Sequence, residues 1–120
     1  MGTVVKEGGL FKLPTWSKGP ASQLEKQFKL RYFTLVKEGE LARIIYFKTN
    51  KKDRSKPTGG PIGSMDIVTA SFERLNKLDF ELWNDKKRFY CRAFSEVIAN
   101  DWEEALNAAG VSKYLEYDDE

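Results

Sequence analysis

The sequence predicts a mainly β fold, in which seven short strands precede a single α-helix. Between residues 4 and 94, apolar and polar side chains alternate in short runs, which is the period of a half-buried strand. Turn-forming residues separate these runs. From Ser95 onward the apolar spacing changes to that of an amphipathic helix. With 120 residues, of which 41% are hydrophobic, residues 1–120 are expected to form one domain around one core.

The first predicted strand covers residues 4–13, where two glycines permit a bend, and Pro14 ends it. A long polar connection leads to residues 28–37 and 41–48, which predict a hairpin with its turn in the sequence KEGE. Residues 49–61 form a basic loop that fits neither a strand period nor a helix period. Four further strand-like runs follow, at residues 62–68, 70–75, 79–84 and 88–94. The last two of these runs predict a hairpin that turns at Asn84 and Asp85.

The final element has the pattern of an amphipathic helix. Its apolar face is formed by Ile98, Trp102, Ala105, Leu106 and Ala109. Ser95 is suited to the N-cap, and Gly110 to the position after the last turn. The helix is therefore expected to pack one face, including Trp102, against the strands.

Composition argues against several classes of function. The chain has no histidine, the most versatile acid, base and metal ligand, and no spacing of other residues suggests a metal site. Cys91 alternates in phase with Phe89 and Ala93, so we expect it in the core and not as a nucleophile. We therefore predict a protein that is not an enzyme and needs no metal or cofactor. A single cysteine, without a signal-peptide pattern or a long apolar run, favours the cytoplasm.

Charge is distributed unevenly along the chain. Residues 1–56 contain 13 Lys and Arg against 5 Asp and Glu, whereas residues 57–120 contain 7 against 13. A positive pole suits a phosphate-bearing ligand, an anionic membrane or a nucleic acid.

The sequence FKLRYFTL, residues 28–35, places cations on the same side of a strand as core residues. Lys29 and Arg31 share the parity of Phe33 and Leu35. Either the core lies on the opposite face and the cations are solvated, or the strand runs from the open mouth of a barrel into its interior. Lys12 follows Leu10 at the same parity. An antiparallel meander would bring Lys12 to the same end of the sheet as Lys29 and Arg31, which favours the interpretation that these cations line the mouth of a barrel.

Seven motifs in this order resemble a pleckstrin homology domain: EGGLFKL, FKLRYFTL, IIYFK, IGSMDI, FELW, RFYCRAFS and DWEEAL. The resemblance covers about residues 5–109 and leaves residues 110–120 as a short C-terminal extension. It implies a seven-stranded, partly open barrel of two orthogonal antiparallel sheets. It also implies that the C-terminal helix caps the barrel and packs its tryptophan, here Trp102, on the sheets.

The pattern is similar to that of the phosphoinositide-binding members of this family. The resemblance implies that the headgroup site is formed by Lys12, Lys29, Arg31 and Tyr46, with help from the loop residues Lys51, Lys52, Arg54 and Lys56. Trp16, Lys18 and Leu24 are candidates for membrane contact, although Trp16 and Leu24 could equally fold back onto the barrel rim. The first loop is poor in cations and the last strand pair has no histidine. The choice between 3-phosphorylated lipids and the 4,5-bisphosphate therefore stays open.

These observations predict a monomeric, non-catalytic, cytoplasmic module that phosphoinositides recruit peripherally to anionic membranes. The alternative is a protein-interaction module on the same fold, with weak or no lipid selectivity, that uses a sheet edge or the helix face. Binding to nucleic acid is disfavoured because most aromatic residues lie in strand phase with apolar ones.

Overall fold

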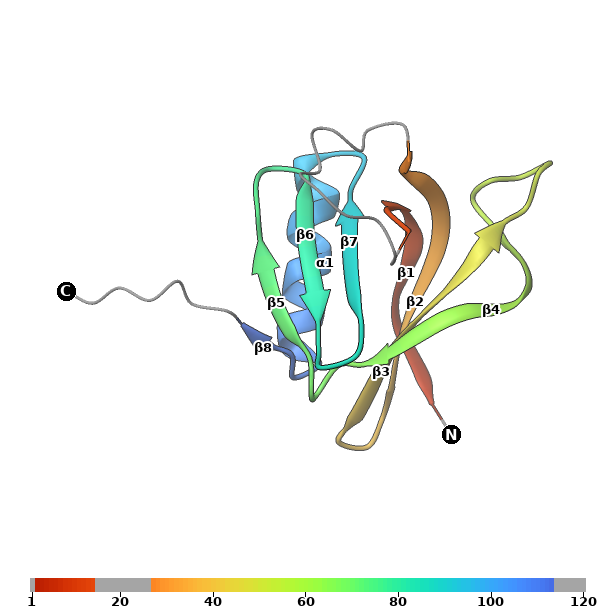
Figure 1. The fold of residues 1–120 in the computed structure, drawn as a ribbon. Helices are drawn as coiled ribbons and strands as arrows, with labels where there is room; N and C mark the ends of the chain where they lie inside the picture. Colours follow the sequence, from red (N-terminus) through yellow and green to blue (C-terminus); the bar gives the residue numbers. More distant parts are fainter. Residues whose placement is uncertain (1, 15–26, 114–120) are drawn as a thin grey trace.

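The computed structural model describes residues 2–14 and 27–113, which form one mainly antiparallel β-barrel and one helix (Figure 1). No described helix has the length and apolar character that crossing a bilayer requires. The elements, in chain order, are β1 (Thr3–Lys12), β2 (Lys29–Glu38), β3 (Leu41–Thr49), β4 (Pro57–Asp66), β5 (Ser71–Arg74), β6 (Asp79–Trp83), β7 (Arg88–Arg92), α1 (Glu96–Ala108) and β8 (Ser112–Lys113).

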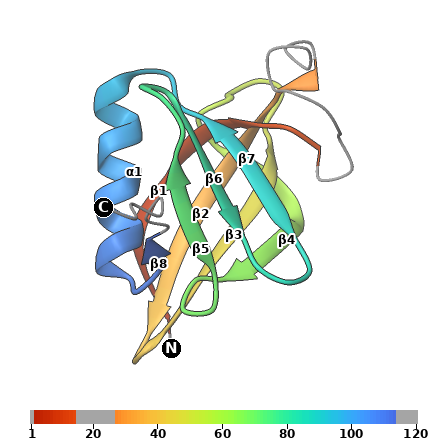
Figure 2. The same cartoon turned by 60° about the vertical axis from the view of Figure 1, so that its left-hand side comes forward.

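The strands lie in the order β4-β3-β2-β1-β7-β6-β5-β8. β1 joins the two halves of this sheet, because it pairs with β2 along its length and with β7 only through Phe11–Arg92 and Lys12–Cys91. The half formed by β5, β6 and β7 crosses the half formed by β1, β2 and β3 at a steep angle (Figure 2). The predicted seven-stranded barrel with a C-terminal helix is thus confirmed. The two-residue β8, which pairs in parallel with β5, was not predicted.

Alternate residues of the strands build the core. Leu10, Phe33, Leu35 and Ile44 are all fully buried, and β6 and β7 contribute Phe80, Leu82, Phe89 and Cys91 with at most 1% of their surface exposed. The period of two fixes this division, since a side chain that faces the core is followed by one that faces outward.

The helix α1 covers one end of the barrel, as the sequence predicts. Ser95 is its N-cap and accepts a hydrogen bond from the Ile98 backbone nitrogen at 3.2 Å. Trp102 is 1% exposed, and its ring meets that of Phe33 edge-on with 6.4 Å between centroids. The opposite face of α1 is acidic. The helix contains Glu96, Asp101, Glu103 and Glu104, and no basic residue.

β4 begins earlier than the sequence predicts and departs from regular pairing. Pro57 and Thr58 pair with Thr49 and Lys48, so the ladder begins within the stretch predicted to be a loop. Residues 59–62 then stand opposite Phe47 alone before pairing resumes at Gly63 and Tyr46. Because of this interruption, the period of two predicted only the later part of the strand, from residue 62, and residues 57–61 were expected to be loop. The interruption forms a large bulge at the rim of the barrel.

A buried ion pair fixes β6 to β7 on the outer face of the barrel. Asp79 is 2% exposed and accepts hydrogen bonds from Arg92 Nε at 2.7 Å, Arg92 Nη2 at 3.0 Å and the Tyr90 hydroxyl at 2.7 Å. Burial acts to raise the pKa of Asp79, but these hydrogen bonds outweigh it and hold the pKa below its ordinary value. The charge is therefore compensated, and the strand pair that ends in the β6–β7 turn is held in place.

Candidate functional site

A pocket of about 270 Å³ lies where β1 ends and β2 begins. Its lining brings together all four strand residues that the sequence singled out: Lys12, Lys29, Arg31 and Tyr46. Strand register explains the convergence, because Lys12 pairs with Lys29 and Leu10 pairs with Arg31. Leu13, Pro14 and Ile62 complete the wall, so no acidic residue is among the described residues that line this pocket.

Lys12 lies deeper than a rim residue. It is 4% exposed, and its ammonium lies 4.8 Å from the Tyr46 ring centroid and 4.9 Å from that of Phe89. It donates one hydrogen bond, 2.9 Å long, to the Leu13 carbonyl oxygen. Burial, with a smaller contribution from nearby Arg31, lowers the pKa of Lys12 from 10.5 to about 8. The site therefore holds a poorly solvated cation, for which an anion would be a favourable neighbour.

Arg31 and Lys29 lie nearer to solvent. Arg31 is half-buried, and its Nη1 donates a 3.0 Å hydrogen bond to the Leu30 carbonyl oxygen, which orients the guanidinium. Lys29 is exposed at the start of β2. Arg31 thus presents a planar guanidinium, and Lys29 presents an ammonium on a flexible side chain. Both groups lie nearer to solvent than the buried Lys12.

Tyr46 forms the wall of the pocket opposite β1. Its ring stacks on Phe33, with 5.4 Å between centroids, and meets Phe89 edge-on at 5.4 Å. Gly63 makes this position possible, because a Cβ at residue 63 would lie 2.7 Å from the Tyr46 ring. Burial raises the pKa of the Tyr46 hydroxyl, so this group stays protonated and can donate a hydrogen bond.

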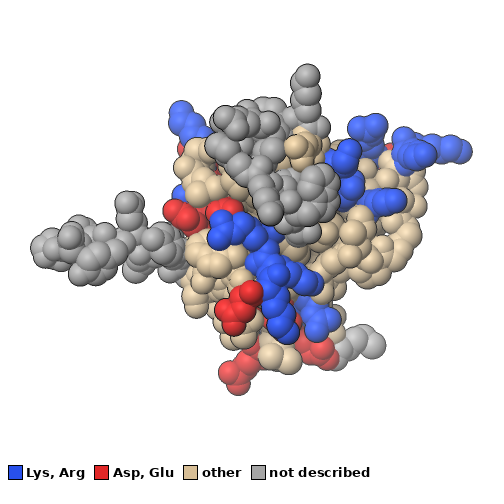
Figure 3. All heavy atoms as spheres, viewed as in Figure 1, with Lys and Arg blue, Asp and Glu red and all other residues tan. Residues whose placement is uncertain are grey.

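The four loop cations predicted to assist lie apart from this pocket. Lys51, Lys52, Arg54 and Lys56 are exposed on the β3–β4 connection, and the pocket lining does not include them. Lys56 Nζ lies 3.9 Å from Asp53 Oδ2, so these two side chains form an exposed ion pair. Figure 3 shows basic side chains on this outlying part of the molecule and a second group over β6 and β7. The candidates Trp16, Lys18 and Leu24 lie outside the described residues.

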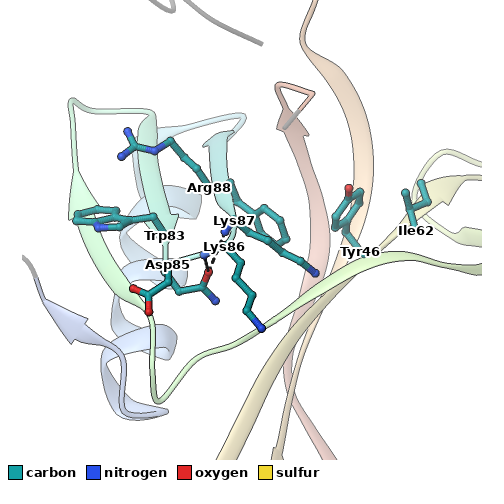
Figure 4. Close-up of a pocket in the computed structure, with 10 residues that line it drawn as sticks. Tyr46, Ile62, Trp83, Asp85, Lys86, Lys87 and Arg88 are labelled. Carbon is teal, nitrogen blue, oxygen red and sulfur yellow. Dashed lines mark hydrogen bonds between the residues drawn. The ribbon is translucent and has the colours of Figure 1, made fainter. Parts of the chain in front are cut away.

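A second pocket adjoins the first and reveals cations that the sequence reading did not select. It has a volume of about 560 Å³, shares Tyr46 and Ile62 with the first pocket, and includes Lys86, Lys87 and Arg88 in its lining. Figure 4 shows Tyr46 and Ile62 on one side of it and the residues of the β6–β7 turn on the other. Lys87 Nζ donates to the Ser64 carbonyl oxygen at 2.7 Å and so ties the turn to β4. In the sequence, the run KKR at a predicted hairpin turn is the signal that could have indicated these three cations.

The arrangement suits an anion and not a metal ion. The two pockets share Tyr46 and Ile62, their linings contain six cations against one carboxylate, and the described residues contain no cluster of acidic, cysteine or histidine side chains that could hold a metal. A phosphate group carries nearly two negative charges and offers several acceptor oxygens, which match the donors of Lys and Arg.

No protein-family model matches this sequence, and no curated protein matches it. The fold does match solved structures. A structure of the C-terminal PH domain of pleckstrin in complex with D-myo-Ins(1,2,3,4,5)P5 superposes with a TM-score of 0.65 and 19% identity, covering 90% of this chain and 99% of that chain.

This chain has the pleckstrin homology fold. A second structure of the carboxyl-terminal PH domain of pleckstrin agrees, with a TM-score of 0.64, 20% identity and coverage of 89% of this chain and 97% of that chain. At this level of identity the likeness concerns the pleckstrin homology fold alone. The bound inositol phosphate belongs to the pleckstrin structure.

Proposed function

We propose that this chain is a non-catalytic module that binds phosphoinositide headgroups and is thereby recruited to the surface of anionic membranes. The observation that carries the proposal is the pocket lined by Lys12, Lys29, Arg31 and Tyr46. The pleckstrin structure with a bound inositol phosphate supports the same class of ligand for this fold.

The chemistry of the pocket favours a phosphomonoester on a sugar-like ring. Arg31 can offer two parallel donors to one phosphate, while Lys12 and Lys29 add point charges. Strands hold these side chains more rigidly than a loop would, which limits the entropy lost on binding. Ring hydroxyls of an inositol could form hydrogen bonds with the Tyr46 hydroxyl and with backbone groups at the pocket wall.

The exposed loop cations have a different role in this proposal. A lysine or arginine near an anionic leaflet contributes about 1 kcal/mol of attraction, which does not depend on the identity of the headgroup. The β3–β4 connection would therefore strengthen membrane attraction in general, and the pocket would supply the preference for phosphorylated inositol.

Arg31→Ala tests the proposal. Charge-assisted hydrogen bonds contribute about 1.5–3 kcal/mol each, so this change should weaken binding of soluble inositol phosphates by about tenfold or more. Arg31→Lys keeps the charge but loses the fork, and should restore part of the affinity. Calorimetric titration measures the soluble ligand, and sedimentation with phosphatidylcholine vesicles that contain one phosphoinositide measures the membrane.

Arg43→Ala is the matched control. The Arg43 side chain is 59% exposed and pairs with Asp66 at 3.5 Å, so the substitution removes the same charge without touching the pocket at the end of β1. Its effect on soluble ligand binding should stay within twofold. A folded Arg31→Ala protein that binds like the parent chain would contradict the proposal.

A further inference from the structure

Ile62 is an exposed apolar residue in an unusual place. It is 44% exposed and lies at the end of the bulge in β4, immediately before regular pairing resumes at Gly63. It lines both pockets of the candidate site. In Figure 4 its side chain stands beside Tyr46 at the rim, away from the labelled residues of the β6–β7 turn.

The backbone before Ile62 departs from regular pairing with β3. Gly59 has a φ of +72°, which side-chain-bearing residues rarely adopt, and a Cβ at Gly59 or Gly60 would meet no atom within 4 Å. Pro61 has no amide hydrogen to donate to a neighbouring strand. Consequently Gly59 and Gly60 have open space where a side chain would lie, and Ile62 follows them at the edge of both pockets.

The charged surroundings of Ile62 indicate what it contacts. Cations line both pockets that Ile62 borders: Lys12, Lys29 and Arg31 in the first, and Lys86, Lys87 and Arg88, beside the one carboxylate Asp85, in the second. An apolar side chain at the edge of pockets lined mainly by cations matches the surface of an anionic bilayer, where phosphates lie above the edge of the hydrocarbon. A hydrophobic protein groove would not in general supply the negative charge for so many cations.

We propose that Ile62 inserts into the interfacial region of an anionic bilayer while the adjoining pockets hold headgroup phosphates. This inference rests on the proposed function and adds to it a residue that contacts lipid without contacting a phosphate. It predicts that binding to a membrane and binding to a soluble headgroup respond differently to one substitution.

Ile62→Ala removes three carbon atoms, and each methylene that leaves water changes an equilibrium by up to about fourfold. Because insertion at the interface is shallow, vesicle affinity should fall by about tenfold, while soluble inositol phosphate affinity should stay within twofold. Leu41→Ala is the matched control, because Leu41 is 69% exposed at the β2–β3 turn and lines neither of the two pockets. It should leave both affinities unchanged.

The vesicles are phosphatidylcholine with phosphatidylinositol 4,5-bisphosphate or the 3,4,5-trisphosphate, whichever the parent chain binds, and the soluble probe is the corresponding inositol phosphate. A second measurement reports the position of the side chain directly. Cys91, the chain's single cysteine, is fully buried, and burial raises its pKa to about 12, so Ile62→Cys introduces a thiol that can be labelled selectively. An environment-sensitive fluorophore there should shift to the blue on adding these vesicles, and the same fluorophore on Leu41→Cys should not.

Each outcome separates the inference from the proposed function. Loss of vesicle affinity with unchanged soluble affinity, together with the blue shift at residue 62 alone, supports insertion. Unchanged vesicle affinity in Ile62→Ala, or an equal loss for the soluble probe, overturns insertion and leaves headgroup binding intact. If the parent chain binds neither the soluble probes nor the vesicles, the proposed function and this inference both fall.

Discussion

Lys12 should make headgroup binding depend on pH in a range where an ordinary lysine does not titrate. Its pKa is lowered to about 8, chiefly because the ammonium is buried. A phosphate ligand is favoured by the protonated form, so affinity should fall as pH rises through 8. The second pKa of a phosphomonoester is about 6, and the ligand itself therefore changes little in charge above pH 7.

The size of the effect follows from the fraction of Lys12 that is protonated. With a pKa of about 8, most molecules carry the charge at pH 7 and about one in ten does at pH 9. If only the ammonium form binds, the dissociation constant rises by about tenfold between these two values. Binding at pH 8 should also take up protons, because the ligand raises the pKa of Lys12.

Stability should change in the opposite direction. Between the folded pKa of about 8 and the ordinary value of 10.5, the unfolded chain binds more protons at Lys12 than the folded chain does. The free energy of unfolding of the ligand-free protein should therefore rise with pH through this window, relative to a Lys12→Met variant.

Calorimetric titration with an inositol phosphate at pH 7, 8 and 9, in buffers of different ionisation enthalpy, measures both affinity and proton uptake. Lys12→Met removes the titrating group while keeping an unbranched apolar stem, and its weaker binding should be nearly independent of pH. An affinity of the parent chain that is constant from pH 7 to 9, or a Lys12→Met variant with the same slope as the parent, would refute the assignment.

Three further outcomes are expected. Trp102→Ala should lower the free energy of unfolding by about 3–5 kcal/mol, because it removes a buried ring that contacts Phe33; a loss below about 1 kcal/mol in a denaturant titration would mean that α1 does not seal the barrel. Gly63→Ala should displace the Tyr46 ring and weaken inositol phosphate binding, whereas Gly39→Asn, at the distant β2–β3 turn where φ is +62°, should not; equal binding by both variants would remove Tyr46 from the site. Neutralising the β3–β4 cations should weaken sedimentation with any anionic vesicle and reduce its salt dependence, while preference among phosphoinositides persists in part; loss of that preference with unchanged binding to phosphatidylserine vesicles would contradict the division of roles. The cations to replace together are Lys51, Lys52, Arg54 and Lys56.

The faces of the strands were accessible to sequence reasoning because a period of two is a geometric property of an extended chain. Parity showed that Lys12, Lys29 and Arg31 lie in phase with apolar residues of their strands, and antiparallel order, which brings them to one end, favoured a position at the barrel mouth. The alternation of side chains along a strand does not show how deeply each side chain is buried. The rings of Tyr46 and Phe89 cover Lys12, and this depends on packing between strands that are distant in the sequence.

Features that depend on long-range pairing were not predicted. The bulge in β4 lies in a Gly-Gly-Pro sequence that has no strand period, and β8 exists only because Ser112 returns to lie beside Ser71. Asp79 is buried under Arg92 and Tyr90, which the strand pattern around it does not indicate. In each case a contact across the fold decides the local structure.

The acidic helix acquires a role once its place in the molecule is considered. α1 carries four carboxylates and no cation, and it stands on the side of the barrel away from the β6–β7 turn (Figure 2). The folded chain is therefore an electric dipole whose positive end is its open end. Near a negatively charged surface, within the Debye length of about 10 Å, this dipole experiences a torque that turns the open end towards the surface before any contact forms. If the open end binds an anionic membrane as proposed, a larger share of collisions arrives in a productive orientation, and added salt slows association by removing this alignment.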